Sequence, residues 1–428
     1  MGDKIIQIFE FGWLRVGEKF GANCIEFKEK HFTLLQQYIT QHHDKKYYQV
    51  YYNKVRFANF VGVIKVADLT IEVLPKTDRH NLGKSAWREV LIEMLMISLQ
   101  VEVETTTLAD LNVKHLTVLE TYMHLFLNET EKLLHHGLIK KYRKERGNQY
   151  AIKGKLITDK QASLNFVHAE RFFVEHNIFD RNNIYNQIIL KALLCIKSIG
   201  VSQFTRNWSS RVLIDFPQCN DIKITESTLN NFTYDRKSSR YKTAIQLAKI
   251  ILLNFHPDIR GGNENVLAIM FDMNLLWETY IYAMLNRANK YHDNQWIITP
   301  QAKTLFWRHP DNWSYNLKPD LLLKNRKTKK ALIMDTKWKF QANTSIEDVR
   351  QMYAYGNFFS SKERYLLYPD LLDKSQPIEK KKGLFFIENS NEISCDNICG
   401  FIFIDLIDEK NRLNKNIGIN ILNQFANA

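Results

Sequence analysis

The spacing of hydrophobic residues changes twice along this chain, and each change restricts the folds that the chain can adopt. Up to Pro75 these residues lie in short β-like runs separated by glycine and polar breaks. After Pro75 the spacing becomes helical, and beyond residue 265 helical and β-like segments alternate. The sequence therefore predicts a multidomain α/β protein. We expect a β-rich N-terminal module at 1–110, a helical connector at 111–260 and a C-terminal mixed sheet flanked by helices at 261–428.

The same spacing predicts individual elements, with Gly, Pro and polar residues marking their ends. Strands of the N-terminal module are expected at 5–11, 49–52, 60–66 and 69–74, with a helix at 32–38. The helices that follow are expected from Ser85 onward and at 115–136, 181–199 and 240–255. In the C-terminal domain we expect helices at 272–288 and 347–359, and strands near 296, at 317–323 and at 331–339. The stretch 257–265 is the clearest domain boundary.

Charge points to a polyanionic partner. The 428 residues include 59 Lys and Arg against 46 Asp and Glu, which gives a net charge of +13. Such a protein attracts nucleic acid at range, although many basic proteins bind none. Five scattered cysteines are too few for a disulfide framework and indicate a reducing compartment, so we expect the cytoplasm. The apolar stretch 90–99 is too short for a bilayer span and contains Glu93, so we expect no membrane anchor.

The segment 317–340 is the most informative part of the sequence. A Pro-Asp pair ending at Asp320 opens an apolar run, a basic turn follows, and a second apolar run at 331–334 ends in Asp335. This pattern predicts two neighbouring strands that bring two carboxylates together. Asp335 and Lys337 are two residues apart, so a β-strand projects their side chains from one face.

A carboxylate that follows four apolar residues is costly to bury unless it is paired or binds a metal. Mg²⁺ prefers oxygen ligands and commonly takes one or two carboxylates with phosphate oxygens and water. Asp320 and Asp335 meet this requirement, and the Thr336 carbonyl offers a third protein oxygen. Lys337 is placed to orient the attacking water, and the carboxylates beside it favour its ammonium form over a general base. The alternative is a solvated salt bridge on a hairpin, because Asp-x-Lys alone is common by chance.

Two helices add polar residues to this region. Glu278 is aligned with the apolar stripe of its helix and therefore needs a partner. In the helix expected at 347–359, Asp348, Gln351 and Tyr355 share one face, which suits contact with a phosphate backbone or with the metal site. Each helix taken alone is equally compatible with an ordinary amphipathic edge.

The ordered set of these motifs resembles a known nuclease core. Glu278, Pro319-Asp320, Asp335-Thr336-Lys337 and Gln351-x-x-x-Tyr355 resemble the PD-(D/E)xK nucleases, in the variant found in RecB-like enzymes. The segment 61–76, which ends in Ile-Glu-Val-Leu-Pro-Lys, is similar to a signature of McrC proteins, as are 233–241 and 271–278. The resemblance spans nearly the whole chain and implies a restriction-endonuclease-like C-terminal domain.

This resemblance implies the endonuclease subunit of a modification-dependent, type IV McrBC-like restriction system that acts on 5-methylcytosine DNA. It implies that the N-terminal module binds and stimulates a McrB-like AAA+ GTPase hexamer, while the C-terminal domain cuts double-stranded DNA with Mg²⁺. It assigns catalysis to Asp320, Asp335 and Lys337, with support from Glu278 and Gln351, and adds Glu278 to Asp320, Asp335 and Thr336 as metal ligands. The specificity domain normally belongs to the partner, so the cognate modification stays open.

Two other functions stay open at this point. One is a non-catalytic DNA-binding regulatory subunit of such a motor, and the other is a stand-alone RecB-like nuclease that needs neither nucleotide nor a second protein. We expect the loops at 12–20 and 44–59 to contact the motor.

Three basic segments, 140–146, 324–330 and 380–382, are candidate phosphate contacts, with a solvated surface as the alternative for each. The second joins the two strands that carry the carboxylates and is the one we favour. The expected nucleic-acid-binding residues are Tyr355, Lys324, Arg326, Lys327, Lys329 and Lys330.

Overall fold

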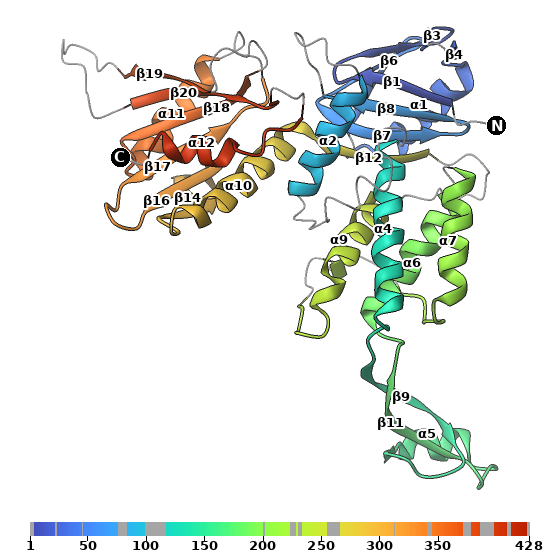
Figure 1. Cartoon of the computed structure of the whole chain (residues 1–428). Coiled ribbons are helices and arrows are strands. Elements are labelled where there is room, and N and C mark those ends of the chain that lie inside the picture. The colour runs from blue at the N-terminus through green and yellow to red at the C-terminus, as the bar shows by residue number, and fades with distance from the viewer. Residues whose placement is uncertain are drawn as a thin grey trace. The chain divides into compact units, whose positions relative to one another are not determined.

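The computed structural model describes residues 4–21, 24–44, 46–75, 84–98, 117–199, 202–222, 228–229, 233–254, 266–311, 313–339, 345–370, 378–385, 398–408 and 412–425. The chain is a mixed α/β protein that forms two compact units (Figure 1). The smaller unit is built mainly of Leu119–Pro257, and the larger unit mainly of Lys4–Glu104 together with Asp258–Ala428. The boundary expected at 257–265 lies outside the described residues, and the division into three domains stays a prediction.

The N-terminal part of the larger unit is rich in strands, as predicted. Its four-stranded sheet has the order β1-β8-β7-β12, in which only the β1–β8 pair is parallel. These strands are β1 (Lys4–Phe9), β7 (Phe60–Val66), β8 (Leu69–Leu74) and β12 (Val266–Asp272). Around it lie β2 (Trp13–Arg15), β3 (Lys19–Phe20), β4 (Ile25–Glu26), β5 (Tyr48–Tyr51), β6 (Lys54–Phe57) and helix α1 (Glu29–Gln41). The four predicted strands and the predicted helix are confirmed.

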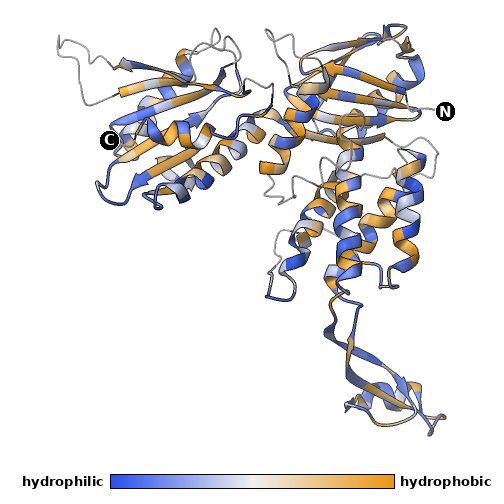
Figure 2. Ribbon diagram, viewed as in Figure 1, coloured by the Kyte–Doolittle hydropathy of each residue, from blue (hydrophilic) through white to orange (hydrophobic). Residues whose placement is uncertain are grey.

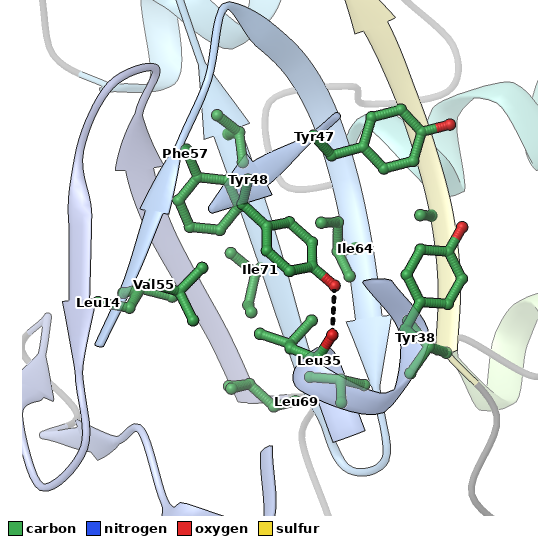
Figure 3. Close-up of a cluster of buried hydrophobic side chains, with 14 of the residues drawn as sticks. Leu14, Leu35, Tyr38, Tyr47, Tyr48, Val55, Phe57, Ile64, Leu69 and Ile71 are labelled. Atoms are coloured by element: carbon green, nitrogen blue, oxygen red, sulfur yellow. Dashed lines mark hydrogen bonds between the residues drawn. The ribbon is translucent and has the colours of Figure 1, made fainter. Parts of the chain in front are cut away.

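The core of this part lies between the four-stranded sheet, α1 and the smaller sheet of order β2-β6-β5. Hydrophobic residues dominate β7 and β8 (Figure 2), and every residue of β8 is buried. Figure 3 shows Leu14 and Val55 of the smaller sheet facing Ile71 of the larger one. The Tyr48 hydroxyl donates a hydrogen bond of 2.9 Å to the Leu35 carbonyl, which ties β5 to α1. Burial of these alternating side chains sets the register of both sheets.

The acid of the Ile-Glu-Val-Leu-Pro-Lys segment has a structural position. Glu72 of β8 is fully buried and accepts hydrogen bonds from Arg88 of helix α2 (Lys84–Ser98), the shortest at 2.7 Å. Gln7 of β1 donates to the same carboxylate at 2.7 Å, and the Val118 amide donates to it at 3.1 Å. Both oxygens are therefore satisfied by groups from three other segments, so Glu72 holds the sheet against its neighbours.

The smaller unit contains the helices predicted at 115–136, 181–199 and 240–255, which are confirmed as α4, α6 and α9. Its helices are α4 (Val118–His135), α6 (Ile184–Ile199), α7 (Gln203–Asp215) and α9 (Lys242–Asn254), with the short η2 (Ser239–Tyr241) before α9. The buried Tyr241 hydroxyl donates to the Asn186 side chain at 2.9 Å and accepts from the Ile139 amide at 3.0 Å. The family-like segment 233–241 thus packs the helices together.

A β-ribbon that the sequence did not predict interrupts the helices expected at 111–260. It pairs β9 (Lys141–Gln149) with β11 (Phe172–Asp180), carries the short β10 (Lys155–Leu156) and α5 (Thr158–Leu164), and extends beyond the helices of its unit (Figure 1). Within the ribbon, Arg143 pairs with Asp180 at 2.8 Å and Arg146 with Glu175 at 2.6 Å. These ion pairs neutralise much of the basic segment 140–146, which weakens its assignment as a phosphate contact.

The C-terminal domain has the predicted mixed sheet, with the order β13-β16-β17-β18-β20-β19. The pairs β17–β18 and β18–β20 are parallel and the others antiparallel. Its strands are β13 (Trp296–Pro300), β16 (Leu321–Asn325), β17 (Ala331–Thr336), β18 (Glu363–Asp370), β19 (Ile378–Leu384) and β20 (Ile398–Asp405), and β14 (Thr304–Arg308) and β15 (Ser314–Leu317) form a separate hairpin. Its helices are α10 (Met273–Tyr291), α11 (Ile346–Phe358) and α12 (Ile417–Asn423).

Strand β12 leads directly into α10, so the N-terminal sheet and the C-terminal domain share one continuous segment. Asp272 ends the strand and caps the helix, because its carboxylate accepts a hydrogen bond of 2.8 Å from the Asn274 amide. None of the helices in the described part of the chain is both long and apolar enough to cross a membrane.

Candidate active site

The β16–β17 hairpin brings Asp320 and Asp335 together, as the sequence predicts. Leu321 pairs with Met334 in this antiparallel hairpin, so extending the register by one residue places Asp320 opposite Asp335. Opposite residues of an antiparallel pair project from the same face of the sheet. The Thr336 amide and hydroxyl donate to one oxygen of Asp320, Oδ2, at 2.7 and 2.8 Å. These two bonds fix the orientation of the Asp320 carboxylate at the end of β17.

Asp335 is a buried carboxylate with one incompletely satisfied oxygen. The residue is 1% exposed, and its Oδ2 atom accepts no hydrogen bond of acceptable geometry. The Lys337 ammonium lies 2.8 Å from that oxygen as an ion pair. Burial, with the charge of Asp320 added, raises the pKa of Asp335 above its ordinary value, and Lys337 opposes this shift. A buried carboxylate in this state favours the approach of a further cation.

Lys337 sits among several acceptors. Its ammonium donates to the Gln351 side-chain oxygen at 3.1 Å and lies 3.6 Å from Asp348. Burial works to lower the pKa of Lys337, but the charges of Asp335, Asp348 and Asp320 outweigh it, so the pKa is raised. The carboxylates around Lys337 therefore favour its ammonium form.

Gln351 and Tyr355 connect helix α11 to the loop that carries Asp320. The Gln351 amide donates to the Tyr355 hydroxyl at 2.6 Å, and that hydroxyl donates to the Lys318 carbonyl at 3.0 Å. Tyr355 is only 3% exposed. We expected this tyrosine to face nucleic acid, but its burial instead makes it a positioning residue for the loop before Asp320.

Glu278 approaches the carboxylates from α10, which packs against β17. Burial, and then the negative charge of Asp320, raises the pKa of Glu278 to about 7. The Gln301 side-chain amide donates to Glu278 at 2.7 Å, and the Gln301 backbone amide donates to the Asp320 carbonyl at 2.8 Å. Glu278 therefore finds a hydrogen-bond partner in Gln301, whereas the hairpin carboxylates repel its charged form.

The donor set fits a hard divalent cation. Among the described residues, no three His, Cys, Asp or Glu side chains are already arranged as a metal cluster. Mg²⁺ does not need such a cluster, because it keeps several waters and uses one or two carboxylates with substrate oxygens. The buried Oδ2 atom of Asp335, paired with the Lys337 ammonium at 2.8 Å and close to Asp320, offers such a carboxylate. Glu278 and the Thr336 carbonyl are the further oxygen donors of the same region.

The basic turn between β16 and β17 lies at the other end of the hairpin. Lys330 and Asp335 are five residues apart along an extended strand, about 17 Å at the usual rise of a strand. A cavity of about 540 Å³ opens beside the turn and is likewise separate from the carboxylates. The turn residues are all exposed, but they do not converge on Asp335: Lys324, Arg326, Lys327, Lys329 and Lys330.

Two contributors to the site, Gln301 and Lys339, were not assigned to it from the sequence. Lys339 forms an ion pair of 3.0 Å with Asp348, whose helical face was expected to contact a phosphate backbone or the metal site. Asp348 also closes a capping box with Ser345 at the start of α11. The signal for Asp348 was its helical face shared with Gln351, whereas the sequence around Gln301 carries no comparable pattern.

Residues 55–369 match the model of a protein family described as a McrBC 5-methylcytosine restriction system component. The matched region includes every residue of the carboxylate site. The chain belongs to this family. The family expected from the motifs is therefore confirmed. No curated protein is significantly similar to the chain in sequence.

Two solved structures resemble the chain at low sequence identity. A half-complex from a tetradecameric assembly of Thermococcus gammatolerans McrB AAA+ hexamers with bound McrC has 16% identity and a TM-score of 0.67, and the match covers 99% of this chain and 100% of that one. The Thermococcus gammatolerans McrBC complex has 18% identity and a TM-score of 0.50, with 67% of this chain and 88% of that one covered. These similarities confirm the predicted α/β architecture.

Proposed function

We propose that this chain is the DNA-cleaving subunit of a McrBC-type restriction system. It hydrolyses phosphodiester bonds of modified double-stranded DNA with Mg²⁺ and works with a McrB-like AAA+ GTPase. The observation that carries the proposal is the meeting of Asp320, Asp335 and Lys337 at one end of the β16–β17 hairpin, where the buried Asp335 carboxylate is paired with the Lys337 ammonium. Family membership supports the same system.

Asp320 and Asp335 hold the metal in this proposal, with Glu278 and the Thr336 carbonyl as additional oxygen donors. When bound, Mg²⁺ supplies positive charge that stabilises the negative charge developing on the phosphate group. Before it binds, the Lys337 ammonium neutralises Asp335 at 2.8 Å. Asp335 can be buried here because a positive charge, from Lys337 or from the metal, lies beside its carboxylate.

Lys337 orients the substrate phosphate or the attacking water rather than deprotonating that water. Its raised pKa favours the ammonium form before the metal binds, so the side chain can donate to a phosphate oxygen or to the attacking water. Gln351 holds that ammonium at 3.1 Å, and Tyr355 holds the loop of Asp320, so both act through other residues. The raised pKa of Glu278, about 7, leaves this side chain partly protonated at neutral pH in the metal-free site, so binding the cation through it would release a proton.

The partner is proposed from the related assembly. In the Thermococcus gammatolerans half-complex, McrC is bound to McrB AAA+ hexamers, and its chain is covered over its whole length by the match. We infer that the present chain likewise binds a McrB-like hexamer and stimulates its GTPase. The modification that is recognised stays open.

The decisive experiment is cleavage of methylated plasmid DNA by the chain reconstituted with the McrB-like protein, GTP and Mg²⁺. Asp335→Ala should abolish cleavage while partner binding and GTPase stimulation persist. The matched control is Asp311→Ala, an aspartate whose side chain is 82% exposed in the same domain, and it should cut normally. Cleavage by the Asp335→Ala complex at the normal rate would refute the assignment.

The same assay separates the alternatives. A regulatory subunit would stimulate the GTPase but give no cleavage with any wild-type combination. A stand-alone nuclease would cut DNA with Mg²⁺ alone, without GTP or partner.

A further inference from the structure

The sheet β2-β6-β5 has two different faces. Figure 3 shows that alternate residues of these strands point into the core. The residues between them project to the opposite side, where Trp13 lies opposite Arg56, and Arg15 lies opposite Lys54. Tyr51 of β5 also lies opposite Lys54. One continuous face therefore carries two aromatic rings and three cations, contributed by all three strands.

The rings and cations of this face are in contact. The ring centroids of Trp13 and Tyr51 are 5.2 Å apart. The Lys54 ammonium lies 4.6 Å from the Trp13 centroid and 5.8 Å from that of Tyr51, and the Arg56 guanidinium lies 5.4 Å from Trp13. Tyr52, in the turn that joins β5 and β6, is 90% exposed. These distances fit cation–π contact.

The positive charge of the face is not matched by acids. Among the described residues, no carboxylate lies within 4.0 Å of the charged groups of Arg15, Lys54 or Arg56. The nearest acid in sequence, Glu18, accepts a hydrogen bond of 3.2 Å from the Arg15 backbone amide. This is unlike the β9–β11 ribbon, where acids pair with the arginines. The face thus offers positive charge to an anionic ligand.

We propose that the outer face of β2-β6-β5 binds single-stranded DNA. This proposal rests on the proposed function only in taking DNA as the substrate. Aromatic rings stack on bases whatever their sequence, and the cations beside them contact the phosphates. A duplex hides the faces of its bases, so the exposed ring of Tyr51 and the half-buried ring of Trp13 favour an unpaired strand. The three strands span about 10 Å, which is room for two or three nucleotides.

The test measures binding of the full-length chain to a fluorescent oligothymidylate of about 20 nucleotides by anisotropy, without divalent cation. Two double variants remove one component each: Trp13→Ala with Tyr51→Ala, and Lys54→Gln with Arg56→Gln. Each should weaken binding by about tenfold or more, and the second should also flatten the dependence on salt. The control Lys197→Gln, an exposed lysine of α6 in the smaller unit, should leave affinity unchanged.

A second measurement, photo-cross-linking, uses the wild-type chain and so does not depend on how substitutions affect folding. Wild-type chain cross-linked to an oligonucleotide containing 5-bromodeoxyuridine should yield modified peptides that include Trp13 or Tyr51. Unchanged affinity of both double variants, or cross-links confined to other segments, would overturn the proposal. So would loss of GTPase stimulation with unchanged DNA affinity, which would make the face a contact for the motor. Since neither measurement requires cleavage, failure here is distinct from failure of the nuclease assignment.

Discussion

Breaking the buried pair between Glu72 and Arg88 should destabilise the larger unit strongly. Glu72 is 0% exposed and Arg88 is 9% exposed, and three hydrogen bonds of 2.7 to 3.0 Å join them. Glu72→Gln removes the buried counter-charge that Glu72 offers to the Arg88 guanidinium, which costs about 3 to 5 kcal/mol. For a unit of this size we expect the melting temperature to fall by about 10 °C.

Differential scanning calorimetry measures this effect, because the two units can unfold in separate transitions. The matched control is Glu347→Gln, which removes a 2.6 Å ion pair with Arg350 on the exposed side of α11 and should cost under about 0.5 kcal/mol. Adding Arg88→Met to Glu72→Gln should recover part of the loss, because no charge then stays buried. If Glu72→Gln melts at the same temperature as the Glu347→Gln control, the structural role of the Glu72–Arg88 pair is refuted.

Three further predictions concern the carboxylate site and its surroundings. Burial raises the pKa of Glu278 from 4.5 to about 7, so ionising this group in the folded protein costs stability. Glu278→Gln should therefore melt at a progressively higher temperature than wild type between pH 4.5 and 7, with no difference below pH 4.5. A melting-temperature difference that stays constant across this range would contradict the raised pKa. Tyr355→Phe removes the hydrogen bond to the Lys318 carbonyl and should slow cleavage about tenfold, with partner binding unchanged in a pull-down; an unaltered rate would exclude this positioning role. Replacing Lys324, Lys327 and Lys330 together with Gln should make the slope of log affinity against log salt concentration shallower, by an amount that corresponds to up to about three lost phosphate contacts. An unchanged slope would assign the basic turn to solvated surface.

The carboxylate site was predictable because its geometry is local. Asp320 and Asp335 lie on one hairpin, and Lys337 follows the last residue of β17, two residues after Asp335, so local strand geometry brings the three together. Gln351 and Tyr355 follow from helical spacing in the same way. Gln301 was not predictable, because its role depends on a left-handed backbone turn with φ of 49° at the end of β13.

Several elements escaped prediction, among them α7 and β18 to β20, and for two others the physical reason is clear. Strand β9 contains no buried residue, so the hydrophobic alternation that marks a half-buried strand is missing, and its charges are accounted for by acids of β11 and β9 itself. Strand β12 belongs to the C-terminal region by sequence but pairs with β7, roughly two hundred residues earlier. Pairing over such a separation leaves no trace in local spacing.

The central claim is that Asp320 and Asp335 hold one divalent cation at which DNA is cut. Anomalous diffraction from crystals of the chain soaked in Mn²⁺ tests it most directly, since Mn²⁺ takes the oxygen ligands that Mg²⁺ prefers. The account predicts a peak in contact with both carboxylates that disappears in Asp335→Ala. A peak elsewhere in the molecule, or one that persists in Asp335→Ala crystals, would contradict it.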